Sequence, residues 1–545
     1  MMRPTGGGDI AGRYDAIIVG GGHNGLVASA YLAGAGLKVL VVERRHLVGG
    51  AAVTEEVFPG FRFSVASYVV SLLRPEIIRE LDLPRHGLEI LPLDGSFTPL
   101  DQGYLWMTSD HGRTMRNLRK LSRRDAEAYD EFGQLMADMV RFIKPIMGVV
   151  PPDPARGSPA QWLSMLPLAR AFRALPPDER GAFIQLMTMS AVDFVSQWFE
   201  TDPVIATMAS WGIIGTFLGI RSPGTAYVML HHYMGEVDGA AGAWGIPRGG
   251  TGAVSEAIAS AARSRGVEIR CDAEVGRILT RKGRAIGVAL RDGEEIRADV
   301  VLSNADANNT YLGLLEPGTI PEDLEEEVRR FKYRGSSGKV NLALDGLPEF
   351  TSLPNSAGTE HLRGAISIGP SIDYLERAYD DAKYGRFSRE PFIDMEIMTL
   401  VDPSMAPPGK HMASCFVQYA PYHLADDKEW DDSEREAFGD AVIDAIARFA
   451  PNIKDLILHR QVLSPKDLED KLALTEGNIF QGELTLEQLF WSRPVPGYGR
   501  FGTPVRNLWL CGSSAHPGGG IMGAPGRLAA LEVLRTLRRR ERRIA

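Results

Sequence analysis

Cysteine is scarce in this chain. Three cysteines, Cys271, Cys415 and Cys511, lie far apart among 545 residues, and no two of them form a C-x-x-C pair. The sequence therefore excludes a disulfide scaffold and gives no sign of a redox dithiol or a zinc ribbon. A sparse, odd number of cysteines is typical of a reducing compartment. We expect a cytoplasmic protein that holds no metal.

The chain also lacks an excess of positive charge. It carries 60 Lys and Arg against 69 Asp and Glu, a formal net charge of −9. Because a dedicated nucleic-acid binder needs a basic surface, we expect no nucleic-acid partner. Apolar residues make up 44% and charged residues 24% of the chain, as in ordinary globular proteins. A chain this long exceeds one ordinary hydrophobic core, so we expect two domains.

Long apolar runs are nearly absent. Residues 1–13 hold no apolar core, which excludes a secretory signal and predicts a disordered tail. One uncharged run, residues 203–220, reaches the lower length limit of a membrane span. It begins with proline and contains three glycines, so we favour a buried or tunnel-lining helix over a transmembrane helix.

A glycine-rich turn follows the first predicted strand. Residues 14–19 are apolar and rich in β-branched side chains, which predicts a buried parallel strand. Gly20, Gly22 and Gly25 then satisfy G-x-G-x-x-G before a helix-forming stretch. Gly20 allows the tight turn, Gly22 lets a pyrophosphate approach the backbone, and Gly25 permits close packing of helix on strand. Asn24 lies inside this turn, and we expect it to contact the dinucleotide.

The residues beyond the second strand extend this motif. Glu43 ends the predicted strand 38–42, where its carboxylate can accept hydrogen bonds from an adenosine ribose. Arg45 can neutralise phosphate charge. Gly49 and Gly50 allow a second loop to approach the same cofactor. The extended pattern E-x-R-x-x-x-G-G favours FAD over a nicotinamide dinucleotide.

A second glycine-rich block lies near the C-terminus. Residues 507–512 predict a strand and a turn, and residues 527–537 predict a helix after a glycine loop. This arrangement resembles that of glutathione-reductase-like and amine-oxidase-like flavoproteins. The resemblance implies that backbone N–H groups and a helix dipole lie against the flavin end, where they can stabilise negative charge on the reduced ring. The residues expected at this end of the cofactor are Gly512, Ser513, Gly520, Ile521 and Met522.

The C-terminal block also contains a second G-x-G-x-x-G, at residues 518–523, which we do not interpret as another dinucleotide site. No strand ends directly before it. We therefore expect one FAD and no nicotinamide site, with reoxidation of the flavin by oxygen or a quinone.

Four segments together carry a resemblance to a known family. They are DPSMAPPGKH (402–411), GNIFQGE (477–483), WSRPVPG (491–497) and NLWLCGSSAHPGGGIMGAPGR (507–527). With the N-terminal motif they make residues 14–537 similar to the phytoene-desaturase-like flavoproteins of the flavin amine oxidase superfamily.

The resemblance implies an α/β fold. A discontinuous Rossmann-like FAD-binding domain and a second, α+β substrate domain are expected. The FAD-binding domain would comprise residues 14–75, 244–312 and 495–545, and the substrate domain residues 76–243 and 313–494. At the position of Val275, relatives use the backbone to bind adenine; a plain β-meander is the alternative interpretation of this region.

No acid, base or nucleophile stands out in the sequence. His231 and His232 are adjacent, so they point apart and cannot bind a metal together from one helix face. His232 is a weak catalytic candidate, and His516, within the C-terminal glycine loop, is a somewhat better one.

The function that follows is FAD-dependent oxidation. The expected substrate is small and hydrophobic, lipid-like or isoprenoid-like, as implied by the desaturase relatives. Amine oxidation, or flavin binding in a regulatory protein without turnover, are the alternatives. The segment 535–543 holds six arginines and one glutamate. Peripheral contact with anionic lipid and a solvated helix end explain it equally well.

Overall fold

The computed structural model describes residues 13–154, 157–237 and 239–544. Most of the predicted N-terminal tail, residues 1–12, lies outside this part, whereas Arg13 already begins the first strand. None of the helices in the described ranges is long and apolar enough to cross a bilayer.

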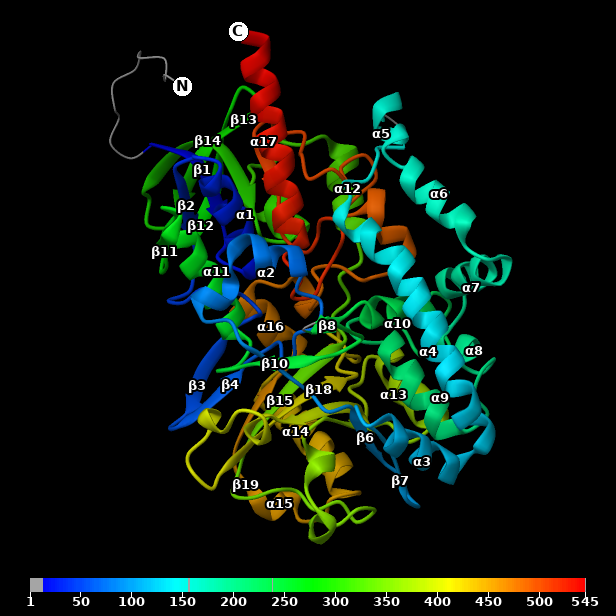
Figure 1. The fold of residues 1–545 in the computed structure, drawn as a ribbon. Helices are drawn as coiled ribbons and strands as arrows, with labels where there is room; N and C mark the ends of the chain where they lie inside the picture. The colour runs from blue at the N-terminus through cyan, green and yellow to red at the C-terminus, as the bar shows by residue number, and fades with distance from the viewer. Residues whose placement is uncertain (1–12, 155–156, 238, 545) are drawn as a thin grey trace.

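A seven-stranded sheet forms the upper half of the molecule in Figure 1. Its strands are β1 (Arg13–Val19), β2 (Val39–Val42), β11 (Glu268–Arg270), β12 (Val275–Arg281), β13 (Arg284–Leu290), β14 (Glu295–Ser303) and β20 (Leu508–Leu510). Strand β1 pairs in parallel with β2 and β14, and β14 pairs in parallel with β20. The order β11-β2-β1-β14-β13-β12, with β20 beside β14, joins segments from both ends of the chain.

Helices pack against this sheet, so its interior strand β2 and the second half of β1 are buried on both faces. The helices are α1 (His23–Gly34), α2 (Pro75–Leu81), α11 (Gly252–Ser264) and α17 (Ala524–Ile544), and α1 packs between α11 and α17. Helix α17 begins three residues before the predicted start and includes the arginine-rich segment.

A second seven-stranded sheet forms the lower half (Figure 1). Its order is β19-β15-β18-β17-β16-β6-β7, and all its pairs are antiparallel except β6 with β16. The strands are β6 (Ser96–Pro99), β7 (Tyr104–Met107), β15 (Ser337–Leu344), β16 (Ala365–Ile368), β17 (Phe392–Ile397), β18 (His411–Gln418) and β19 (Ile457–Leu463).

Two groups of helices accompany the second sheet. The first comprises α3 (His111–Leu121), α4 (Arg123–Ile143), α7 (Pro177–Thr188), α8 (Ala191–Val195), α9 (Asp202–Ala209) and α10 (Thr225–Tyr233). Helices α5 (Pro159–Leu163) and α6 (Leu166–Ala174), between α4 and α7 in the chain, lie in the upper part of the view in Figure 1. The second group comprises α13 (Ile372–Lys383), α14 (Asp432–Ala447), α15 (Ile453–Leu456) and α16 (Pro465–Leu472), whereas α12 (Glu322–Arg330) packs into the core of the first sheet. Three small two-stranded antiparallel sheets complete the fold: β3 (Thr54–Phe58) with β4 (Phe61–Ser64), β5 (Ile90–Pro92) with β10 (Gly245–Pro247), and β8 (Glu236–Val237) with β9 (Ala240–Ala241).

The expectation of a single helix over residues 203–220 is wrong. Helix α9 ends at Ala209, one turn of 3-10 helix covers Ser210–Gly212, and the chain then turns. Gly215 has a φ of +71°, which a helix cannot accommodate, and a Cβ there would lie 2.3 Å from the Phe480 ring. The stretch is nonetheless largely buried, as expected.

Candidate functional site

The two glycine-rich motifs meet at one cavity of about 420 Å³. This volume lies in the usual range for ligand sites. The side chain of Asn24 donates a hydrogen bond to Ser513 Oγ at 3.1 Å, across 489 residues of sequence. The predicted cofactor residues that line the cavity are Gly20, Gly22, Asn24, Glu43, Arg45, Gly49, Gly50, Val275, Ser513, Gly520 and Ile521.

The first glycine turn is tight, for the reasons the sequence indicates. Gly20 has a φ of +93°, and a Cβ on Gly25 would lie 2.4 Å from the Gly20 carbonyl oxygen. Gly49 N–H donates to the Gly21 carbonyl at 2.9 Å, which brings the second glycine loop against the first. Helix α1 follows, and no side chain caps its N-terminus. Its dipole and free N–H groups therefore suit a pyrophosphate.

Glu43 lies at the end of β2, where it organises the turn. It is 6% exposed, and its carboxylate accepts hydrogen bonds from the backbone N–H of Gly21 at 2.7 Å and of Arg45 at 2.9 Å. Each carboxylate oxygen keeps a second acceptor position. The group can therefore hold the turn and still accept hydroxyl hydrogens from a ribose.

Arg45 has one guanidinium nitrogen free for a ligand. Its Nη2 pairs with Glu55 Oε1 at 2.8 Å, whereas the buried Nη1 has no hydrogen-bond partner. A buried donor without a partner costs about 1–3 kcal/mol. Because Arg45 lines the cavity beside the glycine loops, an anionic phosphate would satisfy this donor. The residues present thus suit the diphosphate of FAD.

We expect the variant Arg45→Met to bind FAD about 10- to 100-fold more weakly, because a charge-assisted hydrogen bond contributes about 1.5–3 kcal/mol. Isothermal titration of the apoprotein with FAD measures this. Arg270→Met serves as the control. Arg270 lies on the outer strand β11, forms an ion pair with Glu294 and does not line the cavity. Equal affinities for the two variants would contradict a phosphate contact from Arg45.

Three predicted cofactor residues lie behind the cavity wall rather than in it. Gly25, Gly512 and Met522 are absent from the lining. A Cβ on Gly512 would lie 2.5 Å from the Asn304 carbonyl oxygen, so this glycine allows two backbone segments to touch. Met522 is buried in the core, and its carbonyl accepts from Arg74 N–H. These residues position the lining.

The order of the two histidine candidates is reversed. His516 is buried edge-on against Phe490 and does not line the cavity. His232 does line it, and its Nδ1 lies 2.8 Å from the Val228 carbonyl oxygen. Burial lowers the pKa of each ring to about 4, so both are neutral at pH 7. Neither is arranged as a general base.

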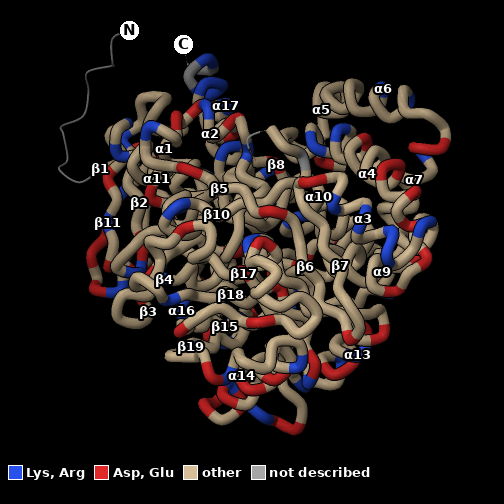
Figure 2. The backbone as a smooth tube through the Cα atoms, turned by 60° about the horizontal axis from the view of Figure 1, so that its bottom comes forward, with Lys and Arg blue, Asp and Glu red and all other residues tan. Residues whose placement is uncertain are grey.

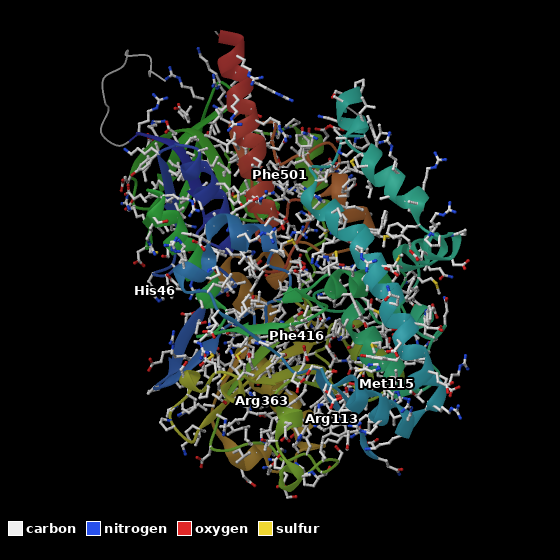
Figure 3. The ribbon with its side chains drawn as sticks, viewed as in Figure 1. His46, Arg113, Met115, Arg363, Phe416 and Phe501 are labelled. Atoms are coloured by element: carbon white, nitrogen blue, oxygen red, sulfur yellow. The ribbon has the colours of Figure 1, made fainter. Side chains whose placement is uncertain are left out.

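Ser71, His232 and Gln481 add polar groups to the remaining wall, but part of this wall is apolar and aromatic, and sequence analysis missed that part. We call it the apolar end; its residues are Tyr68, Val69, Leu72, Ile214, Trp244, Phe416, Ile479 and Phe480. They come from widely separated segments, and Phe416 lies near the middle of the molecule (Figure 3). The charged residues that line the cavity are Glu43, Arg44, Arg45, Glu274 and Arg291, all on the first sheet or its loops. The only available signal was the motif 477–483, which contains Ile479 and Phe480.

Comparison with known proteins agrees with this geometry. Residues 25–534 match the family model for flavin containing amine oxidoreductase. The chain is 41% identical to the mouse (Mus musculus) pyridine nucleotide-disulfide oxidoreductase domain-containing protein 2, covering 97% of this chain and 95% of the relative. It is 24% identical to a lycopene-forming phytoene desaturase from a Paracoccus strain, over 94% of this chain and 96% of the relative.

The fold is shared with solved structures as well. Putrescine oxidase in complex with putrescine superposes with a TM-score of 0.58 at 16% identity, over 96% of this chain and 99% of the other. The α/β fold and the phytoene-desaturase-like resemblance are thereby confirmed. The chain belongs to the flavin-containing amine oxidoreductase family and is a flavin-dependent oxidoreductase with FAD as its cofactor.

Proposed function

We propose that this oxidoreductase removes a hydride from a C–H bond of a hydrophobic, lipid-like or isoprenoid-like substrate. The observation that carries the proposal is the apolar end of the cavity, which has no Asp, Glu, Lys or Arg among its described lining residues. A substrate there exchanges water for aromatic and aliphatic contacts, which favours an uncharged, apolar molecule.

The protein's share of this chemistry is binding, orientation and exclusion of water. When bound, FAD supplies the hydride acceptor. The first glycine turn and α1 would hold the pyrophosphate, Glu43 the ribose and Arg45 a phosphate. The C-terminal loop around Gly520 would close the other side, next to the apolar end.

Oxygen or a quinone would reoxidise the flavin. The second sheet is largely antiparallel, and helix α17 follows the second G-x-G-x-x-G without a further strand among the residues that the structure describes. The described chain therefore forms one dinucleotide-binding unit, in the first sheet.

Anaerobic mixing of the FAD-loaded protein with phytoene in detergent micelles, methyl oleate and putrescine tests the proposal. Loss of the oxidised flavin absorption with phytoene or methyl oleate is the expected result. Loss with putrescine alone would indicate an amine oxidase instead. Bleaching by NADPH would indicate a nicotinamide-dependent reductase. A flavin that dithionite reduces, but that none of these compounds does, would favour the regulatory alternative.

We also propose that the enzyme is cytoplasmic and contacts anionic membrane surfaces from one end. Large apolar side chains are exposed on α5, α6 and α7: Trp162 (47%), Leu163 (60%), Leu166 (43%) and Ile184 (57%). Helices α5 and α6 contain no acidic residue, and α6 carries Arg170 and Arg173. The arginine-rich end of α17 projects at the same end of the molecule (Figures 1 and 2). Apolar side chains flanked by arginines suit an anionic bilayer.

We expect the full chain to float with vesicles that contain phosphatidylserine and not with neutral phosphatidylcholine vesicles. Removal of residues 538–545 deletes five arginines, each contributing about 1 kcal/mol near an anionic surface, and should weaken binding at least about tenfold. The double variant Trp162→Ser/Leu163→Ser should weaken it similarly. Leu458→Ser is the control, because Leu458 is 42% exposed on β19, at the opposite end (Figure 1). Unchanged flotation of both altered forms would refute the membrane contact.

A further inference from the structure

A group of ionisable side chains is buried in the second sheet directly behind the apolar end. Lys339 lies on β15, Asp394 and Glu396 on β17, and each is almost completely buried. Phe416 of β18 pairs in register with Lys339 on one side and with Asp394 on the other. Residues paired in register share a face of a sheet, so Lys339 and Asp394 flank Phe416 on the face that meets the cavity.

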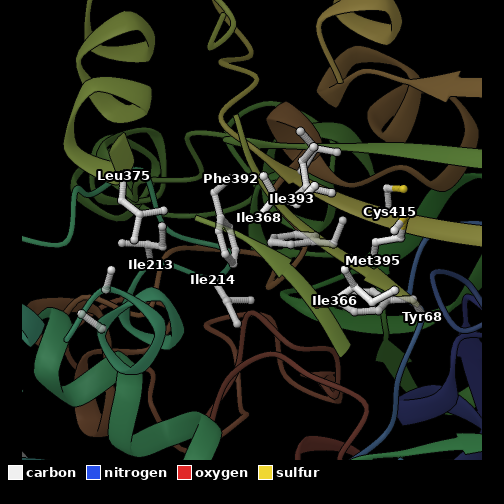
Figure 4. Packing of buried hydrophobic residues seen from close by; sticks show 14 of the residues in the cluster. Tyr68, Ile213, Ile214, Ile366, Ile368, Leu375, Phe392, Ile393, Met395 and Cys415 are labelled. Carbon is white, nitrogen blue, oxygen red and sulfur yellow. The ribbon is translucent and has the colours of Figure 1, made fainter. Parts of the chain in front are cut away.

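Tyr68 connects this group to the cavity. Its ring stacks on Phe416, with centroids 5.7 Å apart, and its Oη donates a hydrogen bond to Asp394 Oδ2 at 3.0 Å. The ammonium of Lys339 lies 4.4 Å from the centroid of the same ring. Tyr68 lines the cavity, whereas Lys339, Asp394 and Glu396 do not. Figure 4 shows Tyr68 among the buried side chains of the core, and its ring is held by the stack on Phe416.

The group is not a satisfied structural ion pair. Lys339 Nζ and both carboxylate oxygens of Glu396 have no hydrogen-bond partner. Burying charges without close partners costs several kcal/mol per ion, and purely structural sites rarely keep such an arrangement. Ionisable groups held in this way beside a ligand cavity are typical of sites that transfer protons.

We propose that Tyr68 and Asp394 form the proton acceptor of the reaction, with Tyr68 as the catalytic residue and Asp394 as the positioning residue that takes the proton onward. This inference rests on the proposed function. It applies to oxidation of a C–C or a C–N single bond, because both release one proton.

Substrate oxidation breaks two bonds to hydrogen and forms one double bond. One hydrogen would leave with its electron pair, for which bound FAD would supply the acceptor and oxidant, and the other would leave as a proton. Tyr68 Oη forms a new O–H bond with that proton while its own hydrogen passes to Asp394 Oδ2. Asp394 becomes a neutral carboxylic acid, and no other reactant is consumed.

The charges around Asp394 are consistent with this role. Burial raises the pKa of Asp394 to about 6, against the lowering effects of the Tyr68 hydrogen bond and of Lys339. Burial also lowers the pKa of Lys339 to about 8, and burial with the nearby Asp394 raises that of Glu396 well above its usual value. Cys415 of β18 is the remaining titratable neighbour, and burial raises its pKa to about 12. At pH 7 Asp394 is therefore ionised and Lys339 protonated. The acceptor is present above pH 6 and is lost below it.

The test measures anaerobic flavin reduction in the FAD-loaded protein by whichever of phytoene, methyl oleate or putrescine reduces the wild type. Tyr68→Phe keeps the stacked ring and removes Oη, and Asp394→Asn keeps a hydrogen-bond partner for Tyr68 but cannot take its proton. We expect each variant to slow reduction about 100-fold or more. The wild-type rate should rise as pH increases through about 6, and Asp394→Asn should lose this rise.

Two controls separate this role from structural damage. Tyr374→Phe removes an equally buried hydroxyl, bonded to the Pro391 carbonyl at 2.9 Å and away from the cavity, and should leave the rate unchanged. All variants should retain FAD and be reduced by dithionite like the wild type.

A second readout needs no turnover. Infrared difference spectra between acidic and neutral pH should show the protonated Asp394 carboxyl appearing near pH 6. The signal should be missing in Asp394→Asn and should move to higher pH in Tyr68→Phe, which lacks the stabilising hydrogen bond. If the wild type is reduced, and Tyr68→Phe and Asp394→Asn are reduced at the same rate as the wild type, the inference is overturned but the proposed function is not. An Asp394 that titrates at the ordinary pKa of about 4 would also overturn the inference. A wild type that no compound reduces would end both the proposed function and this inference.

Discussion

Replacement of Gly25 by alanine is expected to abolish retention of FAD. The new Cβ would lie 2.4 Å from the Gly20 carbonyl oxygen and 3.1 Å from both Asn304 Cβ and Ile18 Cγ2. Backbone and strand atoms surround it, so the glycine turn itself must move. Because that turn has to approach the pyrophosphate closely, we expect FAD affinity to fall at least about 100-fold, which corresponds to ~2.7 kcal/mol.

The ratio of flavin to protein absorbance after gel filtration, followed by titration of the apoprotein with FAD, measures this loss. Gly133→Ala is the matched control. Gly133 lies within α4, and a Cβ there meets no atom within 4 Å. Alanine favours helix over glycine by about 0.5–1 kcal/mol, so the control should bind FAD normally and be slightly more stable. A Gly25→Ala protein purified with full FAD would show that the turn tolerates the displacement.

Replacement of Arg493 by methionine should cause the largest loss of stability. The side chain is fully buried without a carboxylate partner, and its guanidinium donates to five backbone carbonyls, at 2.8–3.3 Å. Those carbonyls belong to Phe480, Gly482, Glu483, Gln488 and Ser513. The residue thus ties the loop behind the apolar end to the C-terminal glycine block. Without it, several buried acceptors lose their donors at about 1–3 kcal/mol each.

Since such losses are only partly additive, we expect a decrease of about 4 kcal/mol in the free energy of unfolding. Urea denaturation followed by tryptophan fluorescence checks it. Arg493→Lys should recover part of the loss, because an ammonium has three donors and cannot reach all five carbonyls. Arg448→Met removes an exposed guanidinium that forms ion pairs with Asp101 and Glu390. It should lower the free energy of unfolding by no more than about 1 kcal/mol. Similar unfolding midpoints for the two methionine variants would contradict this role for Arg493.

The sequence predicts the part of the cofactor site that is formed by neighbouring residues in the chain. The strand, turn, helix and acidic strand end at residues 14–43 are contiguous, and each step follows from backbone geometry at a glycine or from β-branched residues. Ser513 could be assigned to the same site only through the resemblance, because its contact with Asn24 joins distant segments. The misplacement of His516 has the same origin. Membership in a loop does not determine which of its side chains face the ligand.

The proton acceptor proposed here could not be assembled from the sequence. Tyr68 and Asp394 are 326 residues apart, and Lys339 reaches them only through the register of the second sheet. The sequence nevertheless contains an indication that these charged residues have a function. Strands β15 and β17 are otherwise largely apolar, and a lysine or carboxylate inside such a strand must either be paired or have a function.

The first sheet combines strands from distant parts of the chain, and this determines when during synthesis the enzyme can bind its cofactor. Strand β14 pairs with both β1 and β20, and Gly520 lines the same cavity as Gly22. A ribosome must therefore have released the chain at least as far as Gly520 before the flavin cavity exists. Chains that stop before β20 lack Ser513, Gly520 and Ile521 from the cavity wall, so we expect them not to retain FAD.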